Sequence, residues 1–160
     1  MSPHAPYPQG RPRRLRRDDF TRNLVRENMV SPHDLIYPVF VQEGRQRRDP
    51  VASMPGVDRL SLDLLLPVAA QCVELGIPVM AVFPVIDPSL KTPDGQEAWN
   101  ARGLVPRVVH ELKKEFPQLG LMTDVALDPF TSHGQDGLLD DSGYIVNDTT
   151  VAVQIGRAHV

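Results

Sequence analysis

Three short apolar runs alternate with two helical patterns in this chain, and this alternation limits the possible folds more than any other feature. The runs are LIYPVFV at 35–41, PVMAVFPV at 78–85 and LMTDVAL at 121–127. Their length and residue types are typical of buried strands. Apolar residues recur at helical spacing over 61–75 and 103–117. Strand and helix repeats of this length predict right-handed βαβ units and a parallel sheet, so the expected fold class is α/β.

Prolines and glycines set the expected boundaries of these elements. Ser61 is placed to cap the first helix, and Gly76 is placed to end it. Pro67 lies inside that pattern and predicts a kinked first turn or a later start, because proline has no amide donor. Pro106 is compatible with the second helix because it falls in the first turn. The polar stretch 42–61 is rich in turn residues and is expected to be a loop.

The two ends of the chain have weaker patterns. Four prolines fall within the first twelve residues, so we expect residues 1–17 to be disordered and 18–28 to form a short helix. Near the other end, the sequence predicts a small hairpin that turns at 141–143. Asn147 or Asp148 is then expected to cap a further helix.

Length and composition indicate one soluble globular domain. The chain has 160 residues, a net charge of −3 and 41% hydrophobic residues. No apolar run approaches the roughly 18 residues that a membrane span needs, so no membrane association is expected. The first residues carry no apolar segment of the secretory type, and Cys72 is the single cysteine, so no disulfide forms within the chain. We expect a cytoplasmic protein in which Cys72 is a small buried side chain on the first helix.

The segment RPRRLRR, residues 11–17, is strongly basic, with five arginines in seven positions. Such a cluster can bind nucleic acid or an acidic protein surface. No aromatic residues interleave with the arginines, as base stacking would require. The sequence therefore favours a solvated arm over a nucleic-acid site, and no nucleic-acid partner is expected.

The loop TDVALDPFTSHGQDG, at 123–137, is the candidate functional segment. It leaves the carboxyl end of the third strand, where parallel α/β sheets place their functional face, and it carries Asp124, Asp128, Asp136 and His133. Asp124 is expected within the strand and Asp128 at its tip. Gathered carboxylates repel one another unless a cation or a shared proton lies among them, and their oxygens suit Mg²⁺ or a similar ion.

A purely structural interpretation of this loop stays open. Asp128 can cap the turn before Pro129, and Asp136 can form an Asx-turn at Gly137. An isolated histidine such as His133 is more often a hydrogen-bonding loop residue than a metal ligand.

Several separated segments, in order, resemble porphobilinogen synthase, also called 5-aminolevulinate dehydratase. They are the loop above, MPGVDRLS, AVFPV and the arm RRLRRDDFTRNLVREN, and the likeness runs from about Arg13 to about Val153. The resemblance implies the first part of a (β/α)8 TIM barrel at 35–154, preceded by an extended N-terminal arm at 1–34. In the family this arm contacts neighbouring subunits, usually in a homo-octamer. The family's reaction condenses two 5-aminolevulinate molecules into porphobilinogen during tetrapyrrole (haem) synthesis.

The resemblance also implies site residues. Asp124, Asp128 and Asp136 match catalytic positions, and Phe83 and Ser132 match substrate-binding positions. In the zinc-dependent branch of the family, cysteines occupy the places held here by Ala126, Asp128 and Asp136. This sequence has none of those cysteines and resembles the aspartate-rich branch that responds to magnesium, whose Mg²⁺ ligands are expected beyond this chain.

The family's two Schiff-base lysines are also expected beyond this chain. Lys113 and Lys114 lie on a polar helix face and Lys91 in an unrelated loop, so none is assigned that role. We therefore expect this chain to be a fragment that is inactive alone. Residues 155–160, IGRAHV, resemble translated adapter sequence and are expected to be a non-native tail. The alternatives are a small non-enzymatic binding module that docks through its basic arm and a metal-binding hydrolase that uses the aspartates.

Overall fold

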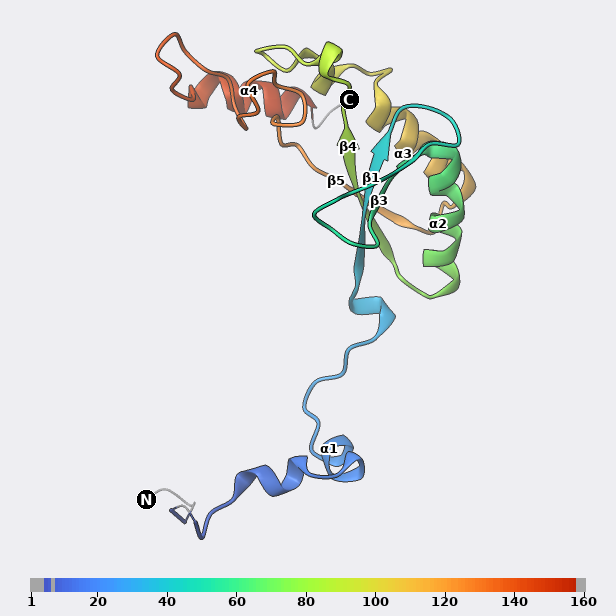
Figure 1. Ribbon diagram of the computed structural model, residues 1–160, viewed down its shortest axis with the longest axis vertical. Coiled ribbons are helices and arrows are strands. Elements are labelled where there is room, and N and C mark those ends of the chain that lie inside the picture. Colours follow the sequence, from blue (N-terminus) through green and yellow to red (C-terminus); the bar gives the residue numbers. More distant parts are fainter. Residues whose placement is uncertain (1–4, 7, 158–160) are drawn as a thin grey trace. The chain divides into compact units, whose positions relative to one another are not determined.

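The computed structural model (Figure 1) describes residues 5–6 and 8–157. The chain divides into two compact units, Met1–Ser31 and Pro32–Val160. Parts of the segment 1–17 and of the expected tail 155–160 lie outside the described residues.

The first unit contains two short helices. They are a 3-10 helix at Pro12–Arg16 and α1 at Asp19–Leu24. The helix predicted at 18–28 is therefore confirmed but ends earlier, and the 3-10 helix was not predicted. No residue of α1 is buried within the unit, and Phe20 and Leu24 are largely exposed.

The second unit is built on a five-stranded sheet whose order is β2-β3-β1-β4-β5. The three predicted strands are β1 at Ile36–Gln42, β4 at Val79–Val85 and β5 at Gly120–Thr123. They pair in parallel, which confirms the predicted α/β class. β5 is shorter than the run that predicted it.

The prediction of a loop over 42–61 is wrong in part. β2 at Arg48–Pro50 and β3 at Asp58–Ser61 lie in this stretch. β3 pairs in parallel with the end of β1, and β2 pairs antiparallel with β3. These strands are short and polar, so they depend on pairing with an existing strand edge, which apolar periodicity does not reveal.

The helix α2 runs from Leu62 to Glu74 and includes Pro67, so the predicted later start is wrong. Ser61 holds the N-cap position, but its hydroxyl contacts no helix amide. Instead Ser61 Oγ donates to Asp63 Oδ1 at 2.6 Å, which lowers the pKa of Asp63, and accepts from the Arg47 amide at 3.0 Å. Gly76 ends the helix with a φ of 74°, as predicted.

The remaining elements follow the predicted order. The helix α3 at Leu104–Glu115 has Pro106 in its first turn, as expected. The predicted hairpin forms around the Leu139–Ile145 bridge, and α4 follows at Asn147–Arg157. Three 3-10 helices connect other elements, and they lie at Pro32–Asp34, Pro88–Leu90 and Gln96–Trp99.

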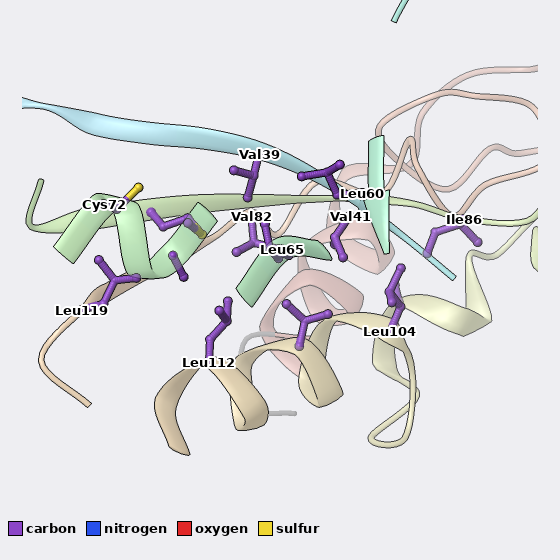
Figure 2. Close-up of a cluster of buried hydrophobic side chains, with 14 of the residues drawn as sticks. Val39, Val41, Leu60, Leu65, Cys72, Val82, Ile86, Leu104, Leu112 and Leu119 are labelled. Carbon is purple, nitrogen blue, oxygen red and sulfur yellow. The ribbon is translucent and has the colours of Figure 1, made fainter. Parts of the chain in front are cut away.

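The core lies between the sheet and the helices α2 and α3, as Figure 2 shows. Val41 and Val82 from the strands meet Leu65 of α2 and Leu112 of α3 in this layer. Cys72 is also buried there, as predicted, and burial raises the pKa of its thiol.

The other face of the sheet is less covered by the described residues. Ile36 of β1 and Met122 of β5 point to that face by strand alternation and are 49% and 48% exposed. A parallel sheet is normally covered on both faces, so this face is suited to line the inside of a barrel. No helix in the described part of the chain is long and apolar enough to cross a membrane.

The core assignment makes a prediction for α2. Leu65 is fully buried, whereas Leu75, just after the same helix, is 56% exposed although it belongs to the apolar helical pattern over 61–75. Leu65→Ala should lower the free energy of unfolding by about 2–5 kcal/mol because it removes buried methyl groups and leaves a cavity. Leu75→Ala should cost about 0.5 kcal/mol or less. Urea denaturation followed by circular dichroism measures both, and equal losses would contradict this assignment.

Candidate active site

An open cavity of about 500 Å³ lies at the carboxyl ends of the parallel strands. Its wall combines aromatic, aliphatic, cationic and acidic side chains. The lining residues are Phe40, Arg59, Phe83, Pro84, Val85, Ile86, Lys91, Asp124, Asp128 and Pro129. Parallel α/β folds place their reactive groups at this end of the sheet.

The strand register explains which side chains share this wall. Phe40 of β1 pairs with Phe83 of β4 on one side and with Arg59 of β3 on the other. Residues paired across parallel strands point to the same face, here the face opposite α2 and α3. The two phenyl rings lie 6.1 Å apart with an angle of 49° between their planes. Phe83, the expected substrate-binding residue, is therefore part of the cavity wall.

Asp124 lies just beyond β5 rather than inside it, because the strand ends at Thr123. Its Oδ1 accepts a hydrogen bond from the Ala126 amide at 2.8 Å. This bond turns the chain locally and competes with further strand pairing, which explains the early end of β5. The carboxylate is exposed and lines the cavity.

Asp128 is exposed and lines the same cavity. The turn that follows is closed by main-chain bonds, since the amides of Phe130 and Thr131 both donate to the Leu127 carbonyl. Among the described residues, no hydrogen bond or ion pair reaches the Asp128 carboxylate, so the interpretation of Asp128 as a turn cap is wrong. Its oxygens remain available to a ligand in the cavity.

Asp136 has a different position. Its Oδ1 accepts a hydrogen bond from the Leu127 amide at 2.6 Å, so it joins the two ends of the loop. The predicted Asx-turn at Gly137 is not the bond it makes, and Asp136 is not among the cavity-lining residues. The structure therefore brings Asp124 and Asp128 to one cavity and leaves Asp136 outside it.

The rest of the loop is fixed by hydrogen bonds to a neighbouring loop. His133 Nδ1 accepts from the Gln135 amide at 3.2 Å, so its proton is on Nε2, which lies 3.0 Å from the Pro93 carbonyl oxygen. This confirms that His133 is a hydrogen-bonding loop residue. The Ser132 amide donates to the Thr92 carbonyl at 3.0 Å, and the Ser132 side chain is exposed. The substrate contact expected of Ser132 remains a prediction.

Sequence analysis missed two cationic side chains in the cavity wall. Lys91 was placed in an unrelated loop, but that loop folds against the 123–137 segment and brings Lys91 to the cavity. Arg59 was hidden because its segment was predicted to be a loop. Arg59 lies in the MPGVDRLS segment that carries part of the family resemblance, but only its pairing with Phe40 shows which face its side chain is on.

Two carboxylates hold the loop that carries Lys91. The hydrogen bonds from Ser89 lower the pKa of Asp87, and those from Gln96 and Thr92 lower the pKa of Asp94. Both carboxylates are therefore ionised at neutral pH, and the turns on each side of Lys91 stay formed.

The described residues do not form a metal centre. No group of three or more histidine, cysteine, aspartate or glutamate side chains among them is arranged to hold an ion. The resemblance places the three cysteine ligands of the zinc-dependent branch at positions 126, 128 and 136, but here Ala126 has no ligand atom and Asp136 accepts a hydrogen bond from the Leu127 amide. These three residues therefore do not match that set of zinc ligands.

Comparison with known proteins gives consistent results. A sequence model of the family described as delta-aminolevulinic acid dehydratase matches residues 9–160. The delta-aminolevulinic acid dehydratase of Bradyrhizobium diazoefficiens is 51% identical over 150 residues, covering 94% of this chain and 42% of that protein. The chloroplastic enzyme of that name from Glycine max is 42% identical, covering 88% of this chain and 34% of its own length.

A solved structure agrees with the fold. Delta-aminolevulinic acid dehydratase (porphobilinogen synthase) from Toxoplasma gondii ME49, in complex with the reaction product porphobilinogen, matches with a TM-score of 0.88 and 44% identity. The match covers 94% of this chain and 43% of that one. The sheet described above is thus the first part of a TIM barrel. The chain spans less than half the length of these relatives, and it belongs to the delta-aminolevulinic acid dehydratase family.

Proposed function

We propose that the protein represented by this chain is a porphobilinogen synthase, a lyase that condenses two 5-aminolevulinate molecules to porphobilinogen. The observation that carries the proposal is the cavity at the strand ends, which combines an aromatic wall with two exposed carboxylates in a chain 51% identical to a named family member. The chain covers the first strands of the barrel, and its Schiff-base lysines are expected in the part of the barrel outside this sequence.

In this proposal Asp124 and Asp128 act on the substrate amino group. Both carboxylates are exposed to the cavity, so they can accept hydrogen bonds from an ammonium group and exchange protons with it. Phe83 supports the substrate chain through apolar contact. Asp136, which the family resemblance groups with them, acts in the same reaction by holding the loop at Leu127.

We also propose the branch and assembly of the enzyme. With aspartates in place of cysteines, its metal is Mg²⁺, held by residues outside this chain. The arm at 1–34 is proposed to contact neighbouring subunits, which is supported by the exposed Phe20 and Leu24 of α1. A cytoplasmic location is also proposed, which is supported by the low cysteine content, with Cys72 the single cysteine of the sequence.

The role of Asp128 can be tested in the full-length protein. Asp128→Ala should lower kcat for porphobilinogen formation by about 100-fold or more, because a positioned proton-transfer group contributes that much. Colorimetric detection of the pyrrole product gives the rate. Asp141→Ala, which removes an exposed aspartate from the hairpin turn, is the matched control. Unchanged turnover in Asp128→Ala would refute the assigned role.

Asp136 calls for a pair of substitutions. Asp136→Asn keeps an oxygen that can accept from the Leu127 amide, whereas Asp136→Ala removes it. If the role is to hold the loop, Asp136→Asn should keep most of the activity and Asp136→Ala should lose about 10-fold or more, with lower loop protection in amide hydrogen exchange. Equal loss in both variants, with unchanged exchange, would instead indicate that the negative charge itself is required.

The metal assignment makes a separate prediction. A zinc-selective chelator should change the activity of the full-length enzyme by no more than about twofold relative to the untreated enzyme, because the loop lacks the cysteine ligands that bind zinc. Adding Mg²⁺ after treatment with EDTA should raise the activity. Metal analysis of the purified enzyme accompanies the assay, and recovery with Zn²⁺ but not Mg²⁺ would overturn the assignment.

A further inference from the structure

We propose that Thr150 is a positioning residue for the reaction, because its hydroxyl fixes the loop segment that holds Asp128 at the cavity. This inference rests on the proposed function and adds a residue that does not line the cavity itself. Thr150 lies near the start of α4 and is only 5% exposed. A buried hydroxyl needs hydrogen-bond partners, and those of Thr150 belong to two different parts of the chain.

The Thr150 hydroxyl joins the start of α4 to the end of the 123–137 loop. Its Oγ1 accepts a hydrogen bond from the Leu138 amide at 2.9 Å and donates one to the Val146 carbonyl at 2.7 Å. The Val146 amide donates in turn to the Leu138 carbonyl at 2.8 Å. Both main-chain groups of Leu138 are therefore held from the α4 side. Without the hydroxyl, the Leu138 amide would lose its acceptor, which is costly for a partly buried donor.

Gly137, the residue before Leu138, fits closely against the same support. It is buried, and a Cβ atom there would lie 2.5 Å from Ile145 Cγ2 and 3.2 Å from Thr150 Oγ1. Gly137 does not have a positive φ, so the close approach is the feature that requires glycine. The backbone that follows Asp136 is therefore fixed by both packing and hydrogen bonds.

This fixed backbone directs the Asp136 side chain to the base of the loop. Asp136 Oδ1 accepts a hydrogen bond from the Leu127 amide at 2.6 Å. Leu127 is fully buried, and its carbonyl accepts from the amides of Phe130 and Thr131. Asp128 follows Leu127 directly and lies inside this turn, so the bond at Leu127 sets where its carboxylate enters the cavity. A displacement of about 1 Å at a reacting group can lower a rate about 100-fold.

The start of α4 can act as a support because it has contacts of its own. Val153 of α4 packs against the hydrophobic core. The hairpin before α4 is closed by Asp140, whose Oδ1 accepts from the Ser142 amide at 2.9 Å and from the Tyr144 amide at 3.0 Å. Thr150 thus connects the catalytic loop to a part of the fold that is held separately.

The test measures porphobilinogen formation by full-length enzyme that carries Thr150→Val. Valine has nearly the shape of threonine but no hydroxyl, so kcat should fall by about tenfold or more, with faster hydrogen exchange in a peptide that contains the Leu127 amide. The value of kcat refers to the folded fraction, measured by circular dichroism, so a loss of stability alone does not lower it.

Two variants serve as controls. Thr150→Ser keeps the hydroxyl and should restore kcat to within about twofold of the unsubstituted enzyme. Thr149→Val is the matched control, because the exposed Thr149 hydroxyl donates to the Val146 carbonyl at 3.2 Å, whereas the Leu138 amide bonds to Thr150. Its kcat should also stay within about twofold.

A double substitution shows whether Thr150 acts through Asp136. Asp136→Ala alone is expected to lose about tenfold in activity, and adding Thr150→Val should cost no more than about twofold further, because both changes break the same link. Losses that multiply in the double variant would show that the two residues act independently and would overturn the inference.

The outcomes separate this inference from the proposed function. An unsubstituted enzyme that does not convert 5-aminolevulinate would refute the proposed function, and the inference with it. An active enzyme whose folded Thr150→Val variant keeps its kcat would overturn the inference alone. If Thr150→Val does not fold, Gly137→Ala carries the test, because its added methyl group pushes on the same backbone. An unchanged kcat in folded Gly137→Ala enzyme would then overturn the inference.

Discussion

The parallel pairing of β1 with β4 is the interaction on which the rest of the structure depends. All seven residues of β1 are in register with all seven of β4, from Ile36 with Val79 to Gln42 with Val85. This register directs Val39, Val41 and Val82 toward α2 and α3, where they form part of the core, and directs Phe40 and Phe83 toward the opposite face. The same hydrogen-bond ladder thus positions both the core and the cavity.

The cavity depends on a second constraint, which is the joining of two loops that are distant in sequence. The Thr92 and Ser132 segments exchange main-chain hydrogen bonds, and His133 reaches the Pro93 carbonyl. Asp136 closes the 123–137 loop at Leu127. The polar side chains of His133 and Asp136, which support the loops, therefore already form hydrogen bonds within the protein. Asp128, in contrast, has no hydrogen-bond or ion-pair partner among the described residues. This division between structural and available carboxylates is what gives the cavity its chemical character.

Much of the fold could be predicted from the sequence because it follows from local patterns. The strands β1, β4 and β5 lie where the apolar runs predicted them, and the helices α2 and α3 lie where the apolar periodicity predicted them. The end of α2 at Gly76 and the turn at 141–143 were also predictable, because the residues at both places favour those backbone conformations. The predictions failed at 42–61, where short polar strands form only because the edge of β1 is available, and at Leu75, whose spacing predicts a burial that the structure does not provide.

For the candidate site, the sequence by itself determined which loop carries the acidic groups and which family the chain resembles, because both are properties of residue order. Tertiary structure decided which of those groups share a cavity. It placed Asp124 and Asp128 together, turned Asp136 to the Leu127 amide and added Arg59 and Lys91 from segments far away in sequence. The physical reason is that a side chain's neighbours depend on strand register and loop contacts, which are long-range interactions that no local pattern encodes.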